Sequence, residues 1–155
     1  MPQPPPELRN LDYFCGTWIS HGEIRPTEGT PGGTLMMTES YQWMEGGFFL
    51  TIRSQFSSPA GSGSGMAFMG YDAVRRLYTY DEFNSTGEAQ HSTGTLEGGT
   101  WIWRGIQHLP HRVTHTRFSM KMLSASQYRF RFEISVDADA WTTVMEGEAN
   151  KQTAG

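Results

Sequence analysis

The chain is poor in cysteine, and its one cysteine, Cys15, excludes an intramolecular disulfide. A protein without disulfides suits a reducing compartment. Cys15 lies between Phe14 and Gly16, and the sequence places no base beside it. We therefore interpret Cys15 as a small core residue and not as a nucleophile.

Long apolar runs and basic charge are also lacking. No segment is apolar over the length that a transmembrane helix requires, and residues 1–7 do not have the pattern of a secretory signal. The 12 Lys and Arg against 16 Asp and Glu give a formal net charge of -4. Binders of nucleic acid or anionic membranes usually carry a clustered basic excess. We therefore expect a cytoplasmic protein with neither partner, and the oligomeric state stays open.

Helical patterns are scarce, and only residues 7–14 carry apolar side chains at roughly helical spacing. The chain holds 18 glycines and 8 prolines, which predict many tight turns between short strands. A chain of 155 residues suffices for one domain with a substantial core. We predict an extended lead-in over residues 1–6, a barrel domain over 7–150 and a tail over 151–155.

What the sequence does contain is alternation of apolar and polar residues with a period of two, clearest over residues 128–136. The pattern recurs between turn residues, and we interpret the Gly- and Ser-rich segment 57–65 as a mobile loop. About ten strands are predicted, over residues 18–25, 33–43, 48–56, 66–71, 77–83, 88–96, 100–104, 112–122, 128–136 and 140–148.

The short connections leave no room for parallel crossovers, so the strands are expected to be antiparallel. Closing so long a meander removes its exposed edges. We predict an all-β fold, a single antiparallel up-and-down β-barrel of about ten strands. The short helix or 3₁₀ turn over residues 7–14 is expected to form a lid at the closed end.

Several short motifs are spaced along the chain. They are Gly16-Thr17-Trp18, Trp43-Met44-Glu45-Gly46-Gly47-Phe48, Gly70-Tyr71-Asp72 with Tyr78, Ser85-Thr86-Gly87 and Gly94-Thr95. A Gly-Thr-Trp triplet at the first strand is a common opening of calycin barrels, the lipocalins and their relatives. Together, the motifs resemble the bacterial lipocalin-like proteins of domain of unknown function family 1579 over nearly the whole chain. The resemblance implies a calycin-type barrel with an internal cavity and supplies no catalytic residue.

Methionines and aromatic residues fall on same-phase faces of the predicted strands, and such side chains suit an adaptable apolar pocket. Arg117 and Arg131 are candidate anchors for a ligand carboxylate if they point inward, and solvated surface if they point outward. The residues that we predict to line the cavity are Met66, Phe68, Trp101, Trp103, Phe118, Met120, Tyr128, Phe130, Trp141 and Met145.

We therefore expect the protein to bind a small apolar or amphipathic molecule without a cofactor. The alternative is a small barrel enzyme of isomerase or cyclase type, which would need an ionisable group with a perturbed pKa in the cavity. Asp81 and Glu82 are candidate carboxylates, but neighbouring strand residues point to opposite faces, so at most one of them faces the cavity.

A second alternative is a haem-binding barrel similar to the nitrobindins, which hold haem through a histidine in their C-terminal part. No histidine follows His115, so His91 and His115 are the candidates. His108, His111 and His115 have a spacing that would suit a metal on a helix, but Pro110 interrupts it and β-forming residues follow. We predict no metal site.

Overall fold

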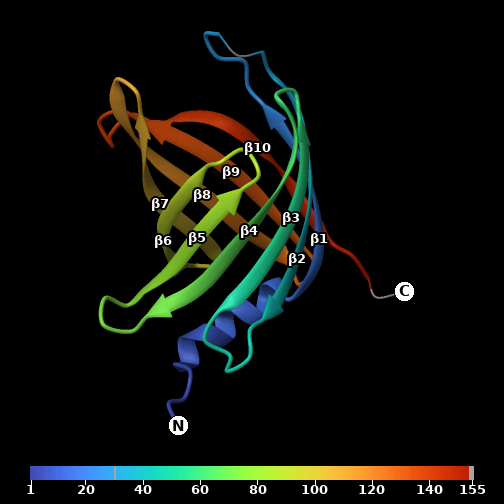
Figure 1. The fold of residues 1–155 in the computed structure, drawn as a ribbon, viewed down its shortest axis with the longest axis vertical. Coiled ribbons are helices and arrows are strands. Elements are labelled where there is room, and N and C mark those ends of the chain that lie inside the picture. Colours follow the sequence, from blue (N-terminus) through green and yellow to red (C-terminus); the bar gives the residue numbers. More distant parts are fainter. Residues whose placement is uncertain (30, 154–155) are drawn as a thin grey trace.

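The computed structural model describes residues 1–29 and 31–153. Ten antiparallel strands form a closed barrel in which neighbours in the chain pair and β1 closes against β10 (Figure 1). In the described part of the chain, no helix has the length and apolar character needed to cross a membrane. The elements are η1 (Pro6–Phe14), β1 (Gly16–Ile24), β2 (Gly33–Trp43), β3 (Leu50–Ser58), β4 (Gly61–Asp72), β5 (Leu77–Asn84), β6 (Ala89–Glu97), β7 (Thr100–Leu109), β8 (Arg112–Ser124), β9 (Gln127–Ser135) and β10 (Thr142–Lys151).

The predicted fold class is confirmed, and the period-two pattern explains it. On β9, Tyr128 and Phe130 are buried while Arg129 and Arg131 are exposed. The apolar face therefore points into the barrel and the polar face points to solvent. Closure satisfies the backbone groups of both terminal strands, because β1 pairs with β10 on one side and with β2 on the other.

The Gly- and Ser-rich segment 57–65 is mostly strand, so our interpretation of it as a mobile loop was wrong. β3 continues to Ser58 and β4 begins at Gly61, which leaves a two-residue turn between them. A Cβ atom on Gly63 would lie 2.6 Å from the Phe56 ring and 2.7 Å from the Ser85 hydroxyl. Glycine is needed there because neighbouring side chains occupy the space, not because the backbone must move.

The 3₁₀ helix η1 closes one end of the barrel, the lower end in Figure 1. Leu8, Leu11 and Phe14 on this helix are buried. The Trp18 indole, which is fully buried, donates a hydrogen bond of 2.9 Å from Nε1 to the Phe14 carbonyl oxygen. Its ring lies 4.9 Å from that of Tyr128. Helix and barrel thus meet in a cluster of aromatic side chains, Phe14, Trp18, Trp101 and Tyr128, which we call the aromatic floor.

Trp18→Ala should cost about 3–5 kcal/mol of unfolding free energy, because it removes a large core side chain and leaves a cavity. Trp141→Ala is the matched control, since Trp141 is partly exposed under the Arg117 guanidinium at 4.1 Å. Losing that cation–π contact should cost about 0.5–1 kcal/mol. Urea titration measures both, and equal losses would contradict the role of Trp18 as the plug.

Candidate functional site

Above the aromatic floor, the barrel interior holds a cavity of about 270 Å³. Its walls are mainly apolar and aromatic, with polar side chains from several strands. The described residues that line it are Ser20, Leu35, Met37, Glu39, Tyr41, Ile52, Ser54, Ala67, Met69, Tyr80, Glu82, Gln90, Ser92, Trp103, Thr116, Phe118, Met120, Tyr128, Phe130, Phe132 and Met145.

Six of the ten residues that we predicted to line a cavity do lie on its wall, although whether they bind a ligand stays a prediction. Trp101 lies below them. It is fully buried, stacks on Trp103 with ring centroids 5.9 Å apart, and contacts Phe14 at 5.6 Å. Trp101 therefore belongs to the floor. The six on the wall are Trp103, Phe118, Met120, Tyr128, Phe130 and Met145.

The other three predicted lining residues lie outside, and their assignment is corrected. On β4, Ala67 and Met69 are buried and line the cavity, so Met66 and Phe68 face the opposite side of the sheet. All four residues are apolar, so the sequence pattern alone did not indicate which two of them point into the barrel. Trp141 packs on the outer surface against Arg117.

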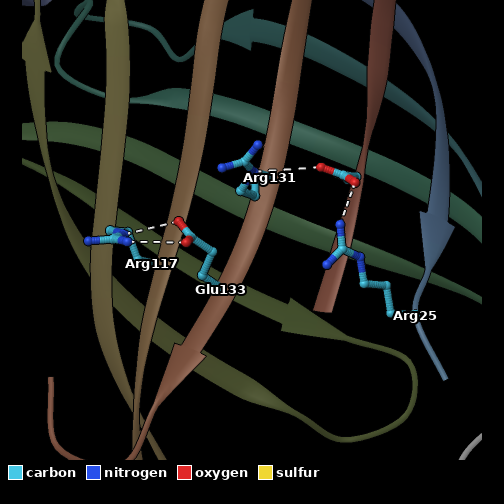
Figure 2. Close-up of polar contacts among 5 residues, drawn as sticks. Arg25, Arg117, Arg131 and Glu133 are labelled. Atoms are coloured by element: carbon cyan, nitrogen blue, oxygen red, sulfur yellow. Dashed lines mark hydrogen bonds and ion pairs between the residues drawn. The ribbon is translucent and has the colours of Figure 1, made fainter. Parts of the chain in front are cut away.

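The two candidate anion anchors also lie on the outer face (Figure 2). Arg117 makes two hydrogen bonds of 3.1 Å to the Glu133 carboxylate. Arg131 lies 3.6 Å from the Glu146 carboxylate, which Arg25 also contacts at 2.8 Å. Arg117 therefore holds a carboxylate that is buried against the outer side of the sheet, Arg131 lies beside an exposed one, and neither arginine lines the cavity.

The charged groups on the described cavity wall are carboxyls, Glu39 on β2 and Glu82 on β5. The strand register places Glu39 opposite Trp18, next to the aromatic floor, and Glu82 opposite Ala67. Asp81, in contrast, points outward and contacts His91 at 2.6 Å. The expectation that at most one of Asp81 and Glu82 faces the cavity is therefore met by Glu82.

The pKa of the Glu39 carboxyl is raised to about 7, mainly by burial and also by the negative charge of the nearby Glu82 carboxyl. A hydrogen bond from Tyr41 acts in the opposite direction. Burial also raises the pKa of Glu82, while the Tyr80 hydroxyl, which donates to its Oε2 at 3.3 Å, lowers it. The cavity thus holds two carboxyls whose pKa values are both raised by burial, that of Glu39 to about 7.

On the same wall, the indole N–H of Trp103 has no hydrogen-bond partner among the described residues. Trp103 is 4% exposed, and its indole Nε1 has no hydrogen-bond acceptor among the described protein atoms. Its ring packs 5.7 Å from that of Tyr80, whose hydroxyl contacts Glu82. A buried N–H without an acceptor is costly, so the wall beside the carboxyls is not fully satisfied by the protein alone.

The histidines considered for haem lie away from the cavity. His91 pairs with Asp81 on the outer face, and His115 lies on β8 between the inward-facing Thr114 and Thr116. No histidine is among the described residues that line the cavity, so the imidazole ligand expected for haem does not reach it. Cys15 is half-buried, and burial raises the pKa of its thiol, which disfavours the thiolate.

Our sequence analysis missed Glu39, although β2 carried a signal. Leu35, Met37, Glu39 and Tyr41 share one face, and Leu35 and Tyr41 are buried. A carboxylate in the apolar phase of a strand points into the core or into a cavity, and such an exception indicates function more often than an apolar residue does. The acidic residue within the apolar series was therefore the feature to follow.

Fold and cavity together define a lipocalin-like barrel with an ionisable, mainly apolar interior. The chain belongs to the family described as protein of unknown function (DUF1579), whose model matches residues 3–151. It matches no curated protein.

Three solved structures illustrate the likeness of fold. Rv2717c from M. tuberculosis is 12% identical with a TM-score of 0.66, and the match covers 97% of this chain and 100% of that one. The S-type phycobiliprotein lyase CPES from Guillardia theta is 9% identical with a TM-score of 0.64, covering 95% and 93%. EF1p2_mFAP2b bound to DFHBI is 13% identical with a TM-score of 0.50, covering 94% and 98%. At such identities the likeness concerns the fold.

Glu39→Gln should remove a pH-dependent loss of stability. The carboxyl has a pKa of about 7 in the folded protein against an ordinary 4.5, so the folded state binds this proton more tightly than the unfolded state. Stability therefore falls as pH rises from about 4.5 to 7 and stays reduced above that, by about 3 kcal/mol at most. In urea titrations we expect the variant to gain about 2–3 kcal/mol at about pH 8 and almost nothing at about pH 4.

Glu45→Gln is the control for this measurement, because Glu45 lies in an exposed turn. It should leave the pH profile of stability unchanged. A Glu39→Gln profile parallel to that of the wild type would contradict the raised pKa of the cavity carboxyl.

Proposed function

We propose that the barrel binds a small, mainly apolar molecule in its interior cavity. The observation that carries the proposal is the unfilled space of about 270 Å³ inside a closed, well-packed barrel. At the closed end of the same barrel, large side chains such as Trp18 and Trp101 are fully buried and fill the interior. The cavity is the part of the interior that side chains do not fill. Space kept open among apolar walls is the usual form of a small-molecule site.

The size of the cavity limits the ligand. At about 30 Å³ per water molecule in the liquid, the cavity corresponds to roughly nine waters, and hence to a molecule of about ten non-hydrogen atoms. Barrels of the same fold offer support, since EF1p2_mFAP2b is bound to DFHBI and CPES is a phycobiliprotein lyase. Native mass spectrometry of protein purified from its own host would identify a co-purified ligand.

Ala67→Phe should block binding, because Ala67 is buried on the cavity wall and a phenyl group there would occupy the free space. The probe is 1-aminonaphthalene, a small fluorophore that responds to its environment and is neutral near pH 7. We expect it to bind the wild type and quench Trp103, the tryptophan on the described cavity wall. The variant should bind at least about tenfold more weakly, a difference of about 1.4 kcal/mol.

Met66→Phe is the matched control, because Met66 precedes Ala67 on β4 and faces outward. It should bind the probe like the wild type, and circular dichroism should show both variants folded. Equal binding by Ala67→Phe and the wild type would place the probe outside the cavity and count against the proposal.

A second candidate function is acid–base catalysis in the same cavity, and Glu39 is the observation that favours it. A carboxyl with a pKa of about 7 is present in both protonation states near neutral pH, which suits a general acid or base. The surrounding apolar walls would strengthen its interaction with a bound substrate. An isomerase or cyclase needs little more than such a group beside a confined substrate.

The Kemp elimination of 5-nitrobenzisoxazole tests whether the cavity carboxylate works as a base. The base takes the proton from C3 while the N–O bond breaks, which gives a coloured cyanophenolate. The rate should rise with pH through about 7, as Glu39 ionises, and Glu39→Gln should lower it about a hundredfold. A rate that Glu39→Gln and Asp81→Asn affect equally would exclude Glu39 as the base and leave binding as the function.

A further inference from the structure

The cavity contains two acidic groups and no described basic group to balance them. Other carboxylates of this protein have cationic partners, such as Glu133 with Arg117 and Glu146 with Arg25. Glu39 and Glu82 face neither lysine nor arginine nor histidine among the described residues of the wall. Burying a carboxylate without a cation is costly, so its counter-charge is expected to come from elsewhere.

The protein satisfies only part of the hydrogen-bonding capacity of these carboxyls. An ionised carboxylate has about four acceptor sites on its two oxygens. Tyr80 donates to Glu82, and Tyr41 is the hydrogen-bonding neighbour of Glu39. The remaining acceptor sites are open to donors from a molecule within the cavity. The ammonium group is compact and carries three N–H donors and a positive charge, so it suits a site with these two acidic groups.

The surroundings of the pair suit the rest of such a molecule. Ala67, opposite Glu82 in the register, is a small residue that leaves space beside the carboxyl. The aromatic rings of Trp103 and Tyr80 lie against one another at 5.7 Å on the same part of the wall. Aromatic faces attract cations, so these two rings suit a cationic group beside Glu82.

We propose that Glu39 and Glu82 form the polar end of the ligand site and select a small apolar molecule that carries a protonated amine. This inference rests on the proposed binding function and specifies its ligand class. It replaces the carboxylate ligand that the sequence allowed if Arg117 or Arg131 pointed inward, because both lie outside while the interior charge is negative. A carboxylate ligand would meet two like charges in a confined apolar space.

Amine binding should depend on pH in a defined direction. The ammonium group pairs with an ionised carboxylate, so binding favours loss of the proton from Glu39, whose pKa is raised to about 7. The titratable groups facing Glu39 are Glu82, Tyr80, Tyr41 and Tyr128, and burial raises the pKa of each of the three tyrosines above its usual value. The tyrosines therefore stay neutral, and affinity for the amine should increase as pH rises from about 5.5 to 8.

The test compares octylamine, octanol and octanoate, which share an apolar tail and differ in the charge of the head group. Each competes with 1-aminonaphthalene on the wild type at about pH 8. We expect octylamine to bind at least about tenfold more tightly than octanol, as for a hydrogen bond to a charged group, and octanoate to bind most weakly. Glu39→Gln and Glu82→Gln should each reduce the preference for the amine to about threefold or less.

Asp81→Asn is the matched control, since it removes an equal charge from the outer face of β5, next to Glu82. It should preserve the full preference for octylamine. If octanoate competes as well as octylamine, or if neither glutamine variant changes the order, the amine proposal is overturned while cavity binding stands. If the probe and all three compounds fail to bind the folded wild type, the proposed binding function fails with it.

Discussion

The pairing of β1 with β10 is the interaction on which the rest of the structure depends. It joins the two ends of a ten-stranded meander, so every strand has a neighbour on both sides. Once the sheet is closed, each alternating residue must point either into an enclosed interior or to solvent. The cavity, its charge and the surface ion pairs are all consequences of that division.

The aromatic floor then divides the interior into a filled part and an open part. Below, η1 inserts Leu11 and Phe14, and Trp18 and Trp101 fill the remaining volume. Above, smaller residues such as Ala67 leave space. The closed end therefore holds fully buried apolar side chains, while the open part of the interior carries two carboxyls whose burial is costly.

Several parts of this structure were predictable because their signal is local. The alternation on β9 and the dense turn residues predicted the strands, and six of ten proposed wall residues were found there. On β4 the same reasoning failed, because residues 66–69 are all apolar. Without alternating polar residues, the sequence does not indicate which of these side chains point into the barrel. The glycines of segment 57–65 suggested flexibility, because the side chains and backbone that crowd Gly63 and Gly65 belong to other parts of the chain and are not visible in the local sequence.

The sequence by itself determined the fold class, the number of strands and the short helical lid, because these follow from periodicity and turn residues along the chain. Only the tertiary structure decided which charges enter the cavity. Glu39 and Glu82 belong to β2 and β5, which are not neighbours in the sheet, and only barrel curvature brings their side chains into one space. Arg117 and Arg131 point outward because the alternate residues Phe118, Phe130 and Phe132 line the cavity, a phase that closure of the barrel fixes.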